Sequence, residues 1–203
     1  NNDTDHAAAS LLLEGSHSSL PARTIVVVDG LQTVVSGTAT VPIPGLSIAG
    51  LATGALSWMV LEGDVGPDPD EFVDLLASPS GSGGLLANAN SPADDPMNRS
   101  ITTTAPAQTG VVGLDLDRFD LAGLLSPGDT ALSITFGADL DKYWPVALIV
   151  AVDAYAPDLG ASTLDWSLDV DADSNSVVSP GDTLAFTLTL DNAGTADALV
   201  SMT

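Results

Sequence analysis

The stretch that decides the fold is Ser126-Pro-Gly-Asp-Thr-Ala-Leu-Ser-Ile-Thr-Phe136, in which a turn leads directly into a strand pattern. Pro fixes φ and Gly accepts a positive φ, so the Pro-Gly pair predicts a tight turn. The residues after it alternate between apolar and polar side chains, which is typical of a strand with one buried face. The same turn and strand pattern recurs at Ser179-Pro-Gly-Asp-Thr-Leu-Ala-Phe-Thr-Leu-Thr-Leu190.

Short apolar or β-branched runs separated by Gly, Pro, Asp and Ser continue this pattern along the chain. Residues 23–30 predict a strand that ends in an Asp29-Gly30 turn, a dipeptide typical of tight hairpins. Asp70–Leu76 is the segment for which a short helix or a loop is expected, and helical periodicity is sustained nowhere. Further strands are expected at Leu11–Leu13, Leu31–Val35, Leu56–Leu61, Val111–Leu116, Val146–Ala154, Thr163–Val170 and Ala198–Met202.

These strands predict an all-β chain with two parts. We expect a β-sandwich domain, jelly-roll or immunoglobulin-like, over residues 1–160, with a long Ser/Gly/Asn/Pro-rich loop at 77–110. Residues 161–203 are expected to form a second, incomplete immunoglobulin-like unit or a donated-strand segment. Val41 to Leu61 is uncharged over about the length of a bilayer, but its prolines and glycines favour two strands and a turn over a membrane span.

The charge is strongly one-sided, with 27 acidic and 4 basic residues and a net charge of −23. Hydrophobic residues make up 45% of the chain, which indicates a folded protein rather than a disordered one. So negative a surface argues against nucleic acid and anionic lipid as partners. It fits a protein of concentrated salt or of calcium-rich water outside cells, and the single lysine, Lys142, favours the halophilic reading.

The side chains that most enzymes use are scarce. The chain has no Cys, which excludes disulfides, thiolate nucleophiles and Cys-ligated metal centres. His6 and His17, the two imidazoles, lie in a polar N-terminal region, and neither a Gly-x-Ser-x-Gly elbow nor a phosphate-binding Gly-Lys motif is present. Glu62 and Asp64 are spaced as a carboxylate pair but have no evident partner. We therefore expect a protein that is not an enzyme.

Acidic residues in alternation are the candidate metal ligands. Asp169-x-Asp171-x-Asp173-x-Asn175 places oxygens as at the start of a calcium loop, so Ca²⁺ is a candidate ligand in a chain for which no other cofactor is expected. The sixth position is Ser and the twelfth is Pro, which excludes an EF-hand and leaves a looser calcium site or a solvated acidic linker. Asp115-x-Asp117 and Asp139-x-Asp141 each project to one face if they lie in strands, and we expect solvated turns there rather than cation sites.

Two further kinds of candidate site are visible in the sequence. Asn98-Arg-Ser and Asn2-Asp-Thr match the acceptor pattern for N-glycosylation. Tyr143 and Trp144 precede Pro145 and are candidates for stacking on sugar rings, whereas Trp58 and Trp166 lie in expected strands and are assigned to the core.

The segment from Ser179 to Ala198 resembles the conserved-repeat, immunoglobulin-like domains of large prokaryotic surface proteins, which open with a Pro-Gly-Asp turn and a Thr-rich strand. Upstream, residues 58–66 and 151–159 are similar to the domain that commonly precedes those repeats in secreted adhesin-like proteins. The resemblance implies two β-sandwich units on an extracellular scaffold, with no catalytic site to carry over.

The family pattern has more strands than this sequence supplies, so either the sequence is a fragment or neighbouring subunits donate strands. The hypothesis is an extracellular, cell-surface structural protein, the subunit of a pilus-like filament or an adhesin stalk, that assembles with copies of itself by β-strand complementation. The alternatives are a carbohydrate-binding adhesion module, with surface glycans as partners, and a β-sandwich capsid protein of a halophilic virus. The candidate intersubunit residues lie in Ala7–Leu13 and Ala198–Met202: Leu11, Leu12, Leu13, Leu199, Val200 and Met202.

Overall fold

The computed structural model describes residues 15, 20, 22–30, 32–50, 52–61, 71–154 and 157–194. The chain divides into two units, residues 1–155 and residues 156–203, each of which is described by itself. Several of the candidate residues lie outside the described residues. These are the glycosylation candidate Asn2, the carboxylates Glu62 and Asp64, and all six candidate intersubunit residues, Leu11, Leu12, Leu13, Leu199, Val200 and Met202.

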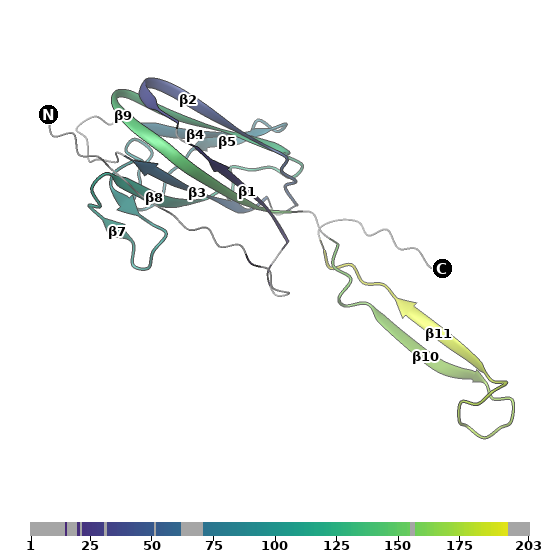
Figure 1. The fold of residues 1–203 in the computed structure, drawn as a ribbon. Helices are drawn as coiled ribbons and strands as arrows, with labels where there is room; N and C mark the ends of the chain where they lie inside the picture. The colour runs from purple at the N-terminus through teal and green to yellow at the C-terminus, as the bar shows by residue number, and fades with distance from the viewer. Residues whose placement is uncertain are drawn as a thin grey trace. The chain divides into compact units, whose positions relative to one another are not determined.

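The first unit is built around one long strand, β9 (Ala131–Asp153), which belongs to both layers of a sandwich-like fold (Figure 1). The first half of β9 pairs with β4 (Phe72–Ser78) on one side and with β2 (Val34–Pro44) on the other. Its second half pairs with β3 (Gly54–Leu61) and β1 (Arg23–Asp29). The nine-stranded sheet therefore curls over where β9 passes from one set of partners to the other.

Strands β1 and β2 follow the same edge of β9 one after the other and in the same direction. The register runs from Arg23 opposite Asp153 to Pro44 opposite Ala131, and the Gly30 and Gln32 N–H groups bond to carbonyls of β9 in between. The prediction of a hairpin at Asp29-Gly30 is therefore wrong. Gly30 has a φ of 140°, which only Gly adopts readily, and the chain bends there without reversing.

Strand β9 changes layers through two irregularities in its pairing. Opposite β2, the register shifts between Val35 and Gly37, so that three residues of β9, 139–141, fall where β2 has only Ser36. Opposite β3, the register shifts between Met59 and Val60, next to Pro145. Pro has no N–H to donate to a neighbouring strand, so inside a sheet it is tolerated at a register shift of this kind.

The remaining strands of the first unit extend the two layers. β5 (Gly83–Leu85) pairs with β4, while β8 (Leu114–Asp120) pairs with β3. β6 (Ser100–Ile101) joins β8 in parallel and pairs with β7 (Gln108–Thr109), so the long segment 77–110 contains three short strands. The short helix or loop expected at Asp70–Leu76 is wrong, because Val73, Leu75 and Ala77 alternate inward and make this segment strand β4.

The core lies between the two layers and is centred on aromatic rings. Trp58 of β3 contacts Phe119 of β8, with ring centroids 4.2 Å apart, and Phe136 of β9, at 5.9 Å. Phe136 in turn lies edge-on to Tyr143, at 6.4 Å. All four side chains are fully buried, so rings from three strands fill the space between the layers.

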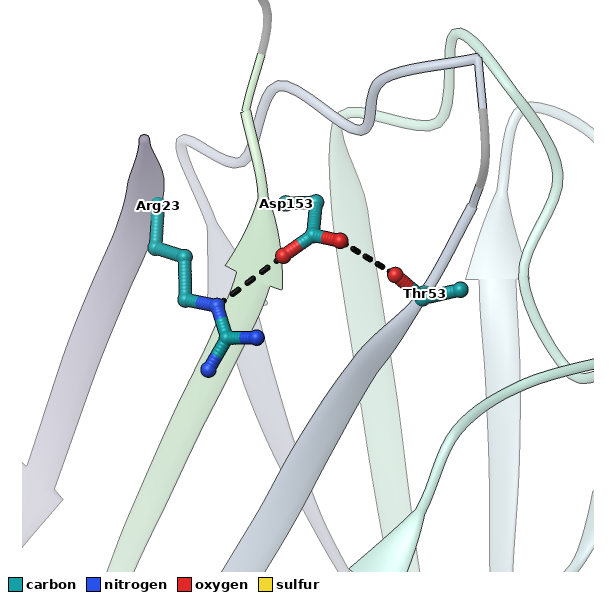
Figure 2. Close-up of polar contacts among 3 residues, drawn as sticks. All are labelled: Arg23, Thr53 and Asp153. Atoms are coloured by element: carbon teal, nitrogen blue, oxygen red, sulfur yellow. Dashed lines mark hydrogen bonds and ion pairs between the residues drawn. The ribbon is translucent and has the colours of Figure 1, made fainter. Parts of the chain in front are cut away.

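Asp153 ties together the strand ends at one end of this unit (Figure 2). Its carboxylate accepts a bond from Arg23 Nε, at 2.9 Å, and another from the hydroxyl of Thr53. Its own N–H donates to the carbonyl of Thr53, and its carbonyl accepts from Ala49 N. The ends of β1, β3 and β9 are thereby held by one residue.

The second unit is a β-hairpin. β10 (Thr163–Val170) pairs with β11 (Thr183–Thr189) in antiparallel register, with Trp166 opposite Phe186 and a shift at Asp169. The prediction of an all-β fold, with a sandwich-like first part and a smaller second β unit, is confirmed. The described residues contain no helix long and apolar enough to cross a membrane, and the uncharged stretch from Val41 forms the end of β2 and all of β3.

Candidate functional sites

The β10–β11 hairpin has one face made of large apolar side chains, which we call the hairpin face. Cross-strand partners in a sheet share a face, so the pairs Leu164–Leu188, Trp166–Phe186 and Leu168–Leu184 form one continuous surface. The opposite face carries Asp165, Ser167, Thr187 and other small or polar residues. Trp166 is 59% exposed and Phe186 is 63% exposed, so the core position expected for Trp166 is wrong. The hairpin supplies no second layer to cover the ring.

The Ser-Pro-Gly-Asp turn has the same geometry at both places where the sequence repeats it. Asp129 accepts a hydrogen bond from Ser126 N, at 2.9 Å, and Asp182 accepts one from Ser179 N, at 2.7 Å. Gly128 and Gly181 have φ values of 88° and 106°, as the Pro-Gly pattern predicts. Each carboxylate also holds a distant segment: Asp129 accepts from Ser80 N and Asp182 accepts from Ala172 N.

Residues 171–182, which we call the acidic loop, contain three of the four predicted calcium ligands, while Asp169 lies in β10. The structure brings oxygens of Asp171, Asp173 and Asp182 within 4.8 Å of one another. Asp169 is not part of this group, and Asn175 uses its side-chain oxygen to accept from Val177 N. Asp182 is the member that the sequence spacing missed, because it belongs to the turn that starts the next strand.

The carboxylates of the acidic loop already have hydrogen-bond donors. Asp171 accepts hydrogen bonds from the N–H groups of Asn175 and Ser176. Asp173 accepts hydrogen bonds from Asn175. Asp182 accepts hydrogen bonds from the N–H groups of Ala172 and Ser179. The Ser176 N–H, followed by other local donors, lowers the pKa of Asp171, and the Ala172 and Ser179 N–H groups lower the pKa of Asp182. The loop geometry thus holds three negative charges in place with its own amides.

A second acidic group, Asp115 and Asp117 on β8, is buried, and we call it the aspartate pair. The two residues alternate onto the inner face of β8 and both have 0% exposure, so the expectation of a solvated turn is wrong here. Ser100 contacts both carboxylates: its N–H donates to Asp115 Oδ1, at 2.9 Å, and its Oγ donates to Asp117, at 3.1 Å. Thr102 N also donates to Asp117, at 3.1 Å.

Burial dominates the electrostatics of the aspartate pair. Burial raises the pKa of Asp115 to about 7, and the negative charges of Asp117 and Asp95 add to this rise. The hydrogen bond from the Ser100 N–H acts in the opposite direction and lowers the pKa. Burial also raises the pKa of Asp117, in opposition to the Thr102 and Ser100 hydrogen bonds. The other two alternating aspartates, Asp139 and Asp141, lie where the register of β9 shifts opposite β2, and their environments differ. Asp139 is exposed, whereas Asp141 Oδ2 is buried without a hydrogen-bond partner.

The glycosylation candidate Asn98 lies in the segment that covers the aspartate pair. Its Nδ2, the atom to which a glycan is attached, donates to the carbonyl of Asn90, at 2.6 Å, and its Oδ1 is buried. The atom that a glycan would modify is therefore engaged in a hydrogen bond within the folded chain.

The aromatic side chains proposed for sugar stacking are not in an exposed loop. Tyr143 is fully buried in β9, its hydroxyl donates to the carbonyl of Gly137, and burial together with the Glu71 and Asp141 charges raises its pKa. Lys142 Nζ lies 4.5 Å from the centroid of the Trp144 ring. The structure therefore removes Tyr143 as a ligand-stacking residue, while the core assignment of Trp58 is correct.

No protein-family model matches the chain, and no curated protein sequence is significantly similar to it. Among solved structures, the chain is similar to one from the crystal structure of the Aeromonas sobria serine protease and chaperone complex, with a TM-score of 0.40 and 10% sequence identity. The alignment covers 67% of this chain and 28% of that chain. A similarity this low transfers neither fold nor activity, so the resemblance to surface-protein repeats stays a prediction from the sequence.

Proposed function

We propose that this chain is a structural protein that assembles with copies of itself, as a subunit of an extracellular filament, fibre or stalk. The observation that carries the proposal is the uncovered hairpin face of β10 and β11. A two-stranded hairpin is marginally stable by itself in water, so an apolar face of this kind gains stability when a second layer covers it.

The distribution of charge makes the hairpin face the place where a second copy can supply that layer. The chain has a net charge of −23, so most contacts between two copies bring carboxylates together. The hairpin face has no charged side chain among its cross-strand pairs, whereas the opposite face carries Asp165. Two copies that meet through the hairpin face therefore bury apolar surface without burying charge.

The two aromatic rings set the scale of this contact. Trp166 and Phe186 are each more than half exposed, at 59% and 63%. Covering about 100 Å² on each ring contributes roughly 5 kcal/mol per copy before the entropy of association is subtracted. That is enough to make these two residues the centre of the interface.

Strand edges would extend such a contact into a polymer. In the described part of the second unit, β10 and β11 pair only with each other, which leaves one edge of each strand open to addition. Face-to-face packing of two copies closes on itself, whereas strand addition at an edge continues from copy to copy and gives a filament.

The test compares two double variants of the full chain by sedimentation velocity and electron microscopy. Trp166→Asp with Phe186→Asp places charge on the hairpin face, and the control, Ser167→Asp with Thr187→Asp, places the same charge on the opposite face of the same strands. We expect wild type and control to assemble and the first variant to stay monomeric, most clearly at high salt, where charge repulsion is screened.

Monodisperse wild-type monomers of 20.4 kDa would refute self-assembly. Closed dimers without filaments would support the hairpin face as an interface and refute the filament. Equal assembly of both variants would show that the contact lies elsewhere in the chain.

A further inference from the structure

The aspartate pair has fewer hydrogen-bond donors than its buried oxygens require. Asp115 Oδ2 is buried and accepts no hydrogen bond, and the same holds for Asn98 Oδ1, two residues before the Ser100 that contacts both carboxylates. An acceptor left without a donor inside a protein costs about 1–3 kcal/mol, and more when it is charged. This is the opposite of the acidic loop, where the clustered carboxylates accept hydrogen bonds from the chain's own donors.

Further oxygens lie near the aspartate pair. Ser91 Oγ lies 3.1 Å from Ser100 Oγ, and both serines are buried. Asp95, in the same covering segment, is near enough for its charge to act on Asp115. Carboxylate and amide oxygens are among the ligands that Ca²⁺ prefers.

We propose that Asp115 and Asp117, with the side-chain oxygen of Asn98, bind a divalent cation, for which Ca²⁺ is the best match. The cation supplies the missing partner of Asp115 Oδ2 and neutralises two carboxylates that burial would otherwise penalise. It also fixes the segment 91–102 onto β8, so binding stabilises the first unit. This site is separate from the acidic loop and does not depend on the proposed assembly.

The position of Trp58 provides a direct probe. Trp58 is the register partner of Asp117, so its ring lies on the same face and close to the pair. A terbium ion bound there is expected to emit when the full chain, stripped with a chelator, is excited at tryptophan wavelengths, and added Ca²⁺ should quench this emission by displacement. Trp166 precedes the acidic loop, so terbium bound to that loop could give the same signal, and the variants must separate the two sites.

The deciding comparison is between Asp115→Asn and Asp173→Asn. We expect Asp115→Asn to weaken terbium and Ca²⁺ binding by about tenfold or more and Asp173→Asn to leave both within about twofold. Ca²⁺ should also raise the unfolding temperature of wild type and of Asp173→Asn, but not of Asp115→Asn.

Absence of binding in wild type, or loss of binding in Asp173→Asn alone, would overturn the proposal. The substitution of Asn for Asp keeps the shape of the side chain, and native mass spectrometry of the wild type tests binding without any variant. A wild-type mass without a bound calcium ion at millimolar CaCl₂ would also overturn it.

Discussion

The pH dependence of stability gives the sharpest test of the buried aspartate pair in metal-free buffer. The pKa of Asp115 is raised from 3.8 to about 7 in the folded chain. A raised pKa on an acid means that the folded state holds its proton more tightly, so stability is greatest below the unfolded pKa and is lost as pH rises through 7. A shift of about 3 units corresponds to roughly 4 kcal/mol, of which about 3 kcal/mol falls between about pH 5 and about pH 8.5.

The measurement is urea unfolding of wild type and Asp115→Asn across this pH range, in chelator and about 0.5 M NaCl to screen the general charge. As pH rises across this range, the free energy of unfolding of the wild type should fall by about 3 kcal/mol. Asp115→Asn should lose most of that pH dependence. Asp117, whose pKa burial also raises, leaves a smaller slope of the same sign. Asp120→Asn, an exposed change on the same strand, should keep the wild-type slope. A flat wild-type profile, or an Asp115→Asn profile as steep as wild type, would refute the reasoning.

The remaining predictions address the core and the turns. Trp58→Ala empties the centre of the aromatic core and should destabilise the first unit by about 3–5 kcal/mol in urea unfolding; a loss under about 1 kcal/mol would place the ring outside the core. Gly137→Ala puts a Cβ into the Phe72 ring, which must then move, so we expect a loss of about 1–3 kcal/mol by the same assay. Asp182→Ala removes the acceptor of the Ala172 N–H, and hydrogen exchange of that amide should accelerate while exchange in the first unit stays unchanged.

Local patterns were sufficient for the strands but not for their partners. The alternation after Ser126 and after Ser179 predicts the strands at 131 and 183 because each side chain's direction depends only on its own backbone. The continuity of β9 was not predictable, because Pro145 reads as a break unless the register shift opposite Met59 is known. The Asp29-Gly30 dipeptide likewise specifies a bend, and whether the chain reverses depends on the neighbouring strand.

Burial of the candidate residues depends on segments distant in sequence. Trp58 and Trp166 occupy equivalent strand patterns, yet only the first faces a second layer. The alternation placed Asp115 and Asp117 correctly on one face, but their burial comes from the segment around Ser100, which the sequence presents only as part of a polar loop. No signal in the sequence connects those two stretches.

The pairing of Arg23 with Asp153 determines how the first unit responds to tension. These residues are register partners at the same end of antiparallel strands, so force applied to the chain before residue 23 and after residue 153 pulls on that end first. The hydrogen bonds between β1 and β9 then break one after another, beginning beside the ion pair, rather than together as in shear. This unit would therefore yield at low force by releasing β1, and the proposed fibre would have to carry load by a path that does not run through that pair of ends.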